Sequence, residues 1–306
     1  KQNMQVIGLA AGTGGSKFLM DGQVIPVAAK TATTTNIFTL GVGASGGAGT
    51  TDFVDSGNRL GLVIYPSTLS DVNAMAGRDA LNNTFGIGAA NDNQVVMSGD
   101  SIMFGGTLTT SLQNRTVARE IRPKLNGNPS IYNMGISSQT LIGTNQMADL
   151  APSREFALAA DGAYGKRVLV IQIGSNDLSI NGGTAGFSQT LYTAVTNYVA
   201  AARAAGFNKI IICTILPAAA FASGQRNTEY LAYNVLVRAN AAGADVVLDL
   251  ANHPVMGLMA NVGTNQYWQD SLHPTGLGNA LVATTGGSVG GRPVNYADAI
   301  NIALAA

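Results

Sequence analysis

Residues 93–306 are predicted to form an α/β fold, a three-layer α/β/α sandwich on a mostly parallel five-stranded sheet. Apolar runs of strand length alternate with longer segments of helical period, which is the pattern of successive right-handed βαβ units. Two of these runs, VLVIQIG at 168–174 and IIICTIL at 210–216, are almost continuously apolar, as expected for parallel strands covered on both faces. The chain is long enough for this fold, because 306 residues can bury a sizeable core.

The composition of residues 1–92 differs from that of the α/β region. Residues 1–92 are rich in Gly, Ala, Thr and Asn and contain short β-branched pieces separated by turn residues, namely QVIPVAA at 23–29, NIFTLGV at 36–42 and RLGLVIYP at 59–66. Such pieces are typical of strands. We therefore predict two domains, a smaller β-rich accessory domain at 1–92 and the α/β domain at 93–306.

The strands of the α/β domain follow from its apolar runs. They are expected at 94–98, 130–133, 167–173, 209–215 and 245–250. In the segment 188–207 between two of them, a helical stripe runs through Leu191, Val195, Tyr198 and Ala202, and Gly206 is placed to end the helix.

Two further helices are predicted after the fourth strand. The segment 227–243 has a stripe through Leu231, Val235 and Ala239, which predicts a helix buried on that face. Near the C-terminus, GGSVGGRP at 286–293 is interpreted as a flexible loop. The residues after it place Tyr296, Ile300 and Leu304 on one stripe, which predicts a last helix docked on the sheet.

Charge and composition exclude several partners. The 17 Lys and Arg residues balance the 17 Asp and Glu residues, so the chain lacks the basic excess that nucleic acid or an anionic membrane attracts. The longest apolar stretch, 210–222, contains Pro217 and is too short to span a bilayer. A surface built from Thr, Ser, Asn and Gln favours an extracellular or surface- or virion-associated protein. The first residue is Lys rather than Met, which predicts a processed chain or a piece of a longer one.

Cysteine and histidine usage argues against metal and disulfide chemistry. The single cysteine, Cys213, lies in an apolar run and is interpreted as a buried hydrophobic residue. No Cys/His cluster with metal-ligand spacing is present in the sequence, so we expect no metal.

Four polar stretches lie at or near strand ends. They are GDS at 99–101, NMGISSQT at 133–140, GSND at 174–177 and DSLHP at 270–274. Because parallel strands present their carboxyl ends at one edge of a sheet, side chains from such stretches can meet there. Acyl transfer needs a nucleophile, a base, a group that orients the base and donors for an oxyanion, and these stretches contain all four.

The candidate roles follow from residue type and spacing. Ser101 can act as the nucleophile and His273 as its base, and Asp270 lies three residues before His273, which puts both side chains on one face of a helical turn. Asn176 and the Ser101 N–H are candidate oxyanion donors. A third donor is expected near Ser138.

In this order, the four stretches resemble the four blocks of the SGNH (GDSL-type) hydrolases, over roughly residues 94–282. The resemblance implies a flavodoxin-like sheet, Ser101 as nucleophile, Asn176 as oxyanion donor, Asp270 and His273 as acid and base, and no cofactor. One block departs from the family. Its second block usually runs from an Asn to a Gly five residues on, whose N–H is an oxyanion donor, whereas that position here is Ser138. We favour the Ser138 N–H, with Gly135 as the alternative.

Three nearby side chains have competing interpretations. His253, which is also followed by proline, is interpreted as structural because its nearest upstream acid, Asp249, is four residues away and on a strand. Tyr267 and Trp268 precede Asp270, and either stack against substrate or pack in the core.

The function expected from these residues is that of a serine esterase. Its ester substrate is expected to be an acetylated carbohydrate such as a polysaccharide, with a short acyl group. Two alternatives remain: a lipase-like or broad acyl hydrolase, and a non-catalytic glycan-binding or structural appendage.

Overall fold

The chain divides into two compact units, residues 1–90 and 91–306. The computed structural model describes residues 93–105, 115–144, 146–159, 164–264 and 266–306 of the second unit, and the backbone of four strands of the first.

The four described strands of the first unit form one sheet in the order β3-β2-β1-β4. They are β1 (Ile7–Ala10), β2 (Ser16–Met20), β3 (Gln23–Val27) and β4 (Val63–Tyr65). Neighbours are antiparallel except β1 and β4, which are parallel. The predicted strand at 36–42 lies outside the described residues, and an accessory role for 1–92 stays a prediction.

The second unit has the predicted α/β/α architecture. Its sheet has the order β6-β5-β7-β8-β9, and every neighbouring pair is parallel. The strands are β5 (Asn93–Gly99), β6 (Ser130–Asn133), β7 (Lys166–Gln172), β8 (Lys209–Cys213) and β9 (Val246–Leu248). In chain order this is the doubly wound, flavodoxin-like arrangement 2-1-3-4-5. The predicted fold class is confirmed.

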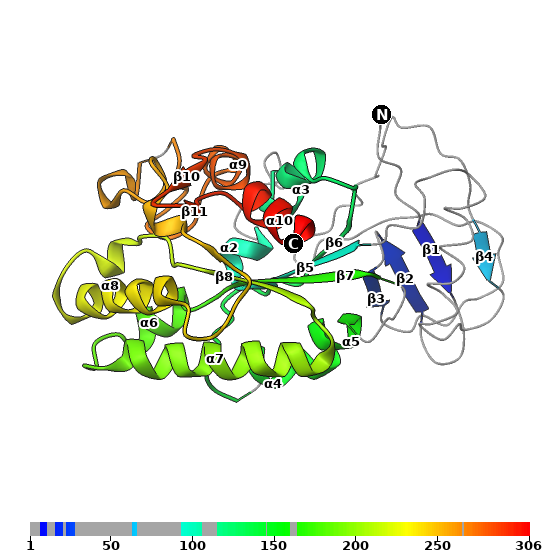
Figure 1. The fold of residues 1–306 in the computed structure, drawn as a ribbon, viewed down its shortest axis with the longest axis horizontal. Helices are drawn as coiled ribbons and strands as arrows, with labels where there is room; N and C mark the ends of the chain where they lie inside the picture. The colour runs from blue at the N-terminus through cyan, green and yellow to red at the C-terminus, as the bar shows by residue number, and fades with distance from the viewer. Residues whose placement is uncertain are drawn as a thin grey trace, which may run out of the picture. The chain divides into compact units, whose positions relative to one another are not determined.

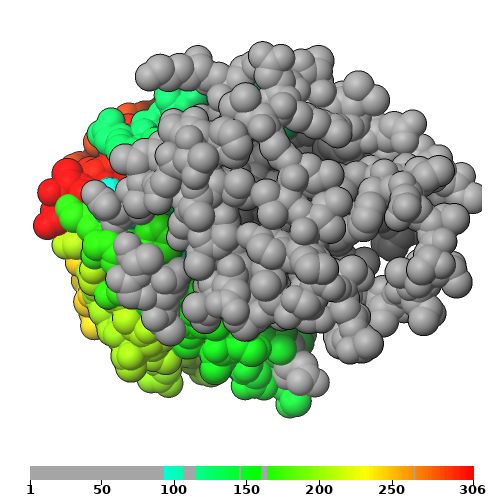
Figure 2. Space-filling view, turned by 90° about the vertical axis from the view of Figure 1, so that its right-hand side faces the viewer, coloured from blue at the N-terminus to red at the C-terminus, as the bar shows by residue number. Residues whose placement is uncertain are grey.

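Helices cover both faces of this sheet (Figure 1). Those on one side include α7 (Phe187–Ala205) and α8 (Gly224–Ala239), and those on the other include α3 (Val117–Ile121), α9 (Gly276–Thr284) and α10 (Tyr296–Ala305). In Figure 2, the C-terminal residues (red) lie above those of the α7–α8 side (yellow-green). Shorter helices are α2 (Ser101–Phe104), α4 (Met147–Leu150), α5 (Glu155–Ala159) and α6 (Ser175–Asn181).

The side chains of strand β7 contribute to two apolar clusters, one on each face of the sheet. Val168 and Val170 pack in the cluster with α9 and α10, whereas Leu169 and Ile171 pack in the cluster with α7 and α8. Because successive side chains of a strand point to opposite faces, a continuous apolar run supplies both layers.

Helix α7 matches its prediction. The four side chains of the predicted stripe, from Leu191 to Ala202, are buried. Gly206 ends the helix with φ 112°, a left-handed conformation that favours glycine, and its N–H bonds the carbonyl oxygens of Ala202 and Arg203.

The predicted face of α8 is wrong. Leu231 and Val235 are 54% and 61% exposed, whereas Tyr230 and Tyr233 are buried. The two tyrosines reach aromatic partners: the Tyr230 ring stacks on Phe221 at 5.1 Å between centroids, and the Tyr233 ring meets Tyr192 at 6.5 Å. Because aromatic rings bury the largest apolar areas, the stripe through them faces the core.

The C-terminal region gives one confirmation and one correction. Tyr296, Ile300 and Leu304 are buried in α10, as predicted. The segment before it is a β-hairpin rather than a flexible loop, because β10 (Ser288–Val289) pairs with β11 (Arg292–Pro293). Gly290 and Gly291 both have positive φ, 57° and 78°, as a two-residue hairpin turn of this hand requires.

The start of α7 is capped by a residue from another helix. Gly186 at the N-cap has no side chain to offer, and the Glu229 carboxylate of α8 accepts hydrogen bonds from Gly186 N (2.9 Å) and Ser188 N (2.8 Å). Gln225 donates a third, at 2.7 Å. Glu229 therefore ties α7 to α8 through the otherwise unpaired N–H groups of a helix start.

Replacing Glu229 should destabilise the fold. Glu229→Gln presents an amide N–H₂ to backbone donors, so the free energy of unfolding should fall by about 1.5–3 kcal/mol in urea titrations. The matched control is Glu120→Gln, which removes an ion pair whose side chains are 24% and 42% exposed. The control should lose less than about 1 kcal/mol.

The same carboxylate makes stability depend on pH. Burial raises the pKa of Glu229, but the hydrogen bonds from Ser188, Gly186 and Gln225 outweigh this effect and lower the pKa to about 2. Its contribution is therefore complete above the ordinary pKa of 4.5 and disappears as the pH falls toward 2. The urea midpoint of the wild type should fall more steeply below about pH 4.5 than that of Glu229→Gln, and parallel curves would contradict the capping role.

Candidate active site

Ser101 lies at a sharp turn from strand to helix. Strand β5 ends at Gly99, where a Cβ atom would lie 2.2 Å from the Gln172 carbonyl oxygen of β7, so the close approach of the two strands requires glycine. Asp100 caps α2 by accepting a hydrogen bond from Ile102 N at 2.9 Å. Ser101 is the first residue of α2, at the carboxyl end of β5 and at the switch point of the sheet.

Asp100 has a structural role as the cap of α2. Its side chain is buried, and burial raises the pKa of the carboxyl to about 7, with the Ile102 N–H opposing this shift and Asp177 adding to it.

Ser101, His273 and Asp270 are joined by two hydrogen bonds. The Ser101 Oγ lies 2.8 Å from His273 Nε2, and His273 Nδ1 lies 2.8 Å from Asp270 Oδ2. If Nδ1 carries the proton shared with the carboxylate, Nε2 is left as an acceptor for the serine hydroxyl. The structure therefore brings together the serine, imidazole and carboxylate that the sequence selected, across 172 residues.

The Asp270–His273 segment is a turn rather than part of a helix. Asp270 Oδ1 accepts hydrogen bonds from Leu272 N and His273 N, both at 2.7 Å, and α9 begins only at Gly276. Burial raises the pKa of the Asp270 carboxyl, but these bonds and the His273 side chain outweigh it and hold the pKa below its ordinary value. The carboxylate is thus held ionised and oriented toward the imidazole.

The loop after β6 packs against the helix that carries Ser101. Asn133 Nδ2 donates to the Met103 carbonyl oxygen at 3.0 Å, and Asn133 Oδ1 accepts from Gly135 N at 3.1 Å. A Cβ on Gly135 would lie 2.5 Å from Phe104 N, so glycine is needed there for the loop to touch α2.

These contacts bear on the two candidates for the third oxyanion donor. The Gly135 N–H is already engaged by Asn133. Ser138 is exposed and has φ 63°, the left-handed conformation that glycine adopts most easily. Serine at this position therefore keeps the backbone shape that a glycine would have.

Helix α6 holds the other side of the same loop. Asn176 Nδ2 donates to the Gln139 carbonyl oxygen at 2.8 Å. The neighbouring Asp177 is buried, its pKa raised by that burial, and its carboxylate accepts hydrogen bonds from Leu141 N and Ile142 N. Asp177 therefore anchors the loop after β6 to α6.

Another buried acid, Glu155, was not found from the sequence. Its Oε1 lies 2.5 Å from the hydroxyl of Ser98, on the strand that leads to Ser101. Arg154, 3.6 Å from the same oxygen, donates to the Met134 carbonyl oxygen in the loop after β6. Burial raises the pKa of Glu155, while Ser98 and Arg154 lower it. The one sequence feature that could have pointed to Glu155 is its position next to Arg154, in a chain with few charged residues.

The aromatic residues beside Asp270 face the core. Trp268 is fully buried and packs in the cluster with α9 and α10, so its ring has no free face for a substrate. Tyr267 is half-buried and packs on the same cluster. Core packing, the alternative that the sequence left open, is the role that these contacts give Trp268.

His253 is held as a structural residue. It is buried, and its Nδ1 accepts hydrogen bonds from Val255 N at 3.2 Å and Met256 N at 3.1 Å. Burial lowers its pKa, with hydrogen bonds at Leu281 and Thr285 opposing this shift. The ring is therefore neutral, and it is engaged away from Asp249, which pairs with Arg238.

Cys213 is buried, and burial raises the pKa of its thiol. Among the described residues, no three His, Cys, Asp or Glu side chains converge as metal ligands. No helix in the described part of the chain has the length and apolarity to cross a membrane.

Comparison with known proteins places the chain in a family. Residues 97–281, more than half of its length, match the model of the GDSL-like lipase/acylhydrolase family. The chain belongs to this family. This match confirms the family resemblance seen in the sequence. The class is that of enzymes that hydrolyse esters and related acyl groups.

Several solved structures are similar to this chain. A member of the lipolytic protein G-D-S-L family from Veillonella parvula DSM 2008 has 17% identity and a TM-score of 0.49, with 62% of this chain and 94% of that chain covered. For the carbohydrate acetylesterase Est24 from Sinorhizobium meliloti the values are 14%, 0.45, 61% and 93%. For an acetyl xylan esterase they are 17%, 0.45, 62% and 96%. A search of curated proteins found no match.

The contact of Gly135 with α2 predicts a sensitive position. In Gly135→Ala, the new methyl group would push the α2 backbone, so we expect a loss of about 1–3 kcal/mol in the free energy of unfolding. The control is Gly183→Ala, where nothing lies within 4 Å of the added Cβ and stability should be unchanged. Equal urea midpoints for the two variants would show that the loop does not need this close contact.

Proposed function

We propose that this chain is a serine esterase that forms an acyl-enzyme on Ser101. The observation that supports it best is the pair of 2.8 Å hydrogen bonds linking Ser101, His273 and Asp270. A serine hydroxyl is a weak nucleophile unless a neighbouring base removes its proton, and the imidazole lies at the right distance to do so.

In the first half of the reaction, Ser101 Oγ attacks the ester carbonyl carbon while His273 Nε2 takes its proton. The Asp270 carboxylate stabilises the imidazolium that results, because it already accepts the Nδ1–H at 2.8 Å. His273 then gives the proton to the leaving alcohol oxygen as the C–O bond breaks, which leaves the acyl group on Ser101.

The negative charge on the carbonyl oxygen needs donors that are in place before the reaction. The Ser101 N–H is available because the first N–H groups of a helix have no partner within it. One N–H of the Asn176 side-chain amide donates to the Gln139 carbonyl oxygen, which fixes the orientation of the amide. The second N–H of the same nitrogen is left for the oxyanion. The Ser138 N–H is the third donor, and Gly135 is disfavoured because Asn133 occupies its N–H.

Hydrolysis completes the cycle. Water attacks the acyl carbon while His273 accepts its proton, and the proton then returns to Ser101 Oγ as the carboxylic acid leaves. Every proton transfer uses one imidazole nitrogen, so the proposed reaction requires no cofactor.

For the substrate, we propose a short acyl ester, such as acetyl, on a carbohydrate. The balanced charge, and a surface expected to be built from uncharged Thr, Ser, Asn and Gln, suit an enzyme that acts on a neutral polymer in an extracellular or surface-associated setting. The β-rich residues 1–92 are then an accessory region. Trp268 gives this proposal no support, because its ring is buried.

A second candidate is hydrolysis of longer acyl chains. Phe104, on the short helix α2 that begins with Ser101, is 47% exposed. Ile142, in the loop after β6, is 36% exposed. Exposed apolar side chains beside an active site are suited to an acyl chain.

An ester panel tests the proposed function. The full chain should release p-nitrophenol and acetate from short acyl esters, and Ser101→Ala should lower kcat by about 10⁴-fold or more. Ser153→Ala is the control, because among the described residues its exposed hydroxyl bonds only the Leu150 carbonyl oxygen, and its loss should leave turnover unchanged.

The chain-length profile separates the candidates. Turnover confined to acetyl and other short esters supports the proposed substrate, whereas a preference for long chains supports the lipase-like alternative. A folded wild-type protein that hydrolyses no ester would overturn the esterase and favour a glycan-binding or structural role.

The oxyanion donors give a separate prediction. Asn176→Ala should lower kcat by about 10²–10³-fold with little change in KM, because the lost N–H acts mainly in the transition state. Ser138→Gly should keep near-wild-type turnover, since it preserves both the N–H and the positive φ of 63°. An unchanged kcat in Asn176→Ala, or a collapse of kcat in Ser138→Gly, would reject the assigned donors.

A further inference from the structure

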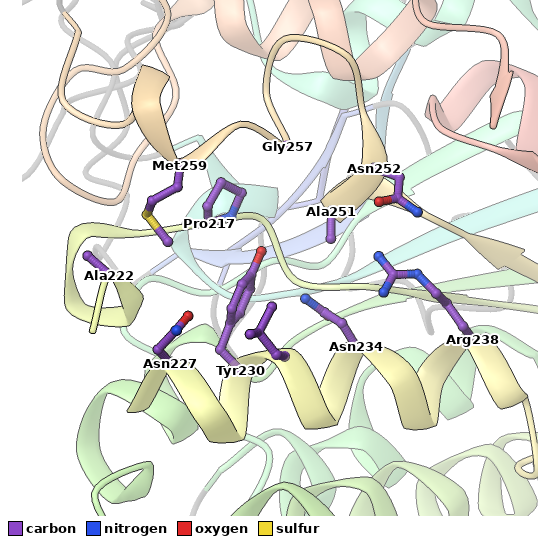
Figure 3. Close-up of a pocket in the computed structure, with 11 residues that line it drawn as sticks. Pro217, Ala222, Asn227, Tyr230, Asn234, Arg238, Ala251, Asn252, Gly257 and Met259 are labelled. Atoms are coloured by element: carbon purple, nitrogen blue, oxygen red, sulfur yellow. The ribbon is translucent and has the colours of Figure 1, made fainter. Parts of the chain in front are cut away.

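A cavity of about 390 Å³ lies away from Ser101, between α8 and the segment that follows β9 (Figure 3). That segment carries the short 3₁₀ helices η4 (Leu250–Asn252) and η5 (Met259–Asn261). The volume is within the range of about 300–1,000 Å³ typical of small-molecule sites. The cavity is near the carboxyl ends of β8 and β9, at the far edge of the sheet from β6.

One wall of the cavity carries a neutralised cation. Arg238 lines it and forms two hydrogen bonds with Asp249, Nε to Oδ2 at 2.8 Å and Nη2 to Oδ1 at 2.9 Å. The Arg238 side chain is 26% exposed, whereas that of Asp249 is 1% exposed. The cavity therefore meets guanidinium N–H donors whose charge is already balanced from behind, which disfavours an anionic ligand.

Two asparagines add both kinds of hydrogen-bonding group. Asn227 lines the cavity from α8 and makes no hydrogen bond to any described residue, so both its N–H₂ and its carbonyl oxygen are free. Asn252, on the opposite side in Figure 3, uses its Nδ2 to bond Asp249 Oδ2 at 2.8 Å and keeps its Oδ1 as an acceptor. Donors and acceptors facing one space match hydroxyl groups, which do both.

Apolar side chains complete the lining. Leu231, 54% exposed on α8, lines the cavity together with Pro217 and Met259. The sequence predicted that Leu231 would be buried in the core, whereas it lies at the surface and supplies an apolar contact in the cavity. Sugar rings combine such surfaces, with C–H groups on their faces and hydroxyls at their edges.

We propose that this cavity is a binding site for a neutral sugar, a monosaccharide or disaccharide unit, separate from the site of acyl transfer. Pro217 and Ala222 line the cavity, and between them in the chain Ala219 N donates to Ser271 O, in the Asp270–His273 turn, at 3.0 Å. A carbohydrate held here would lie beside the wall of the acid–base turn. The proposal does not depend on esterase activity.

Saturation-transfer NMR on the full chain tests it, with methyl β-D-glucopyranoside, methyl β-D-xylopyranoside and xylobiose as neutral probes. At least one probe should bind with a Kd of about 1 mM, the affinity typical of a few hydrogen bonds and one apolar contact. D-galacturonate is the anionic comparison and should bind more weakly. Ser101→Ala should bind the same probe as the wild type, which separates this site from the proposed esterase.

Two variants locate the binding. Asn227→Ala should weaken it by about 5–10-fold, since it removes an amide that has no other partner, and Ala251→Leu should weaken it by filling the cavity. Thr228→Ala is the control, because this exposed neighbour on α8 does not line the cavity.

Three results would overturn the proposal. They are no binding of any neutral probe, binding that both cavity variants leave unchanged, and tighter binding of galacturonate than of the neutral sugars. If Ala251→Leu does not fold, Asn227→Ala decides alone.

Discussion

The order of strands at one end of the parallel sheet is the constraint on which the site depends. Strand β5 lies between β6 and β7, and the connections that leave β5 and β7 start on opposite sides of this switch point. Ser101, the loop after β6 and the first turn of α6 therefore emerge at one edge. The His273 turn, 172 residues away from Ser101 in sequence, completes the arrangement from the α9 side.

Close backbone contacts give this edge its shape. Gly99 lets β5 approach the Gln172 carbonyl oxygen, and Gly135 lets the loop after β6 touch the backbone of Phe104. A methyl group at either position would meet backbone atoms at 2.2 Å or 2.5 Å. Because backbone cannot move aside as a flexible side chain does, these two glycines set where Ser101 lies relative to its surroundings.

Acidic side chains in this sparsely charged chain hold backbone at several turns. Asp177 accepts N–H groups of the loop after β6, and Glu229 accepts those at the start of α7. Glu155 instead joins the strand of Ser101 to Arg154 and, through it, to Met134. Buried carboxylates are costly unless hydrogen bonds compensate, so each of them specifies one arrangement of its neighbours.

The sequence by itself determined the sheet and the residues of the proposed reaction. Continuous apolar runs such as 168–174 can satisfy both faces only as central parallel strands. The four polar stretches, three of which follow strands of this sheet, selected Ser101, Asn176, Asp270 and His273. Tertiary structure decided which of two stripes on α8 is buried, because both are apolar and only the presence of Phe221 and Tyr192 favours the tyrosines. It also decided the partners of Asp177 and Glu155 and the cavity around Asn227. These depend on residues that are distant in sequence, and local periodicity carries no information about such neighbours.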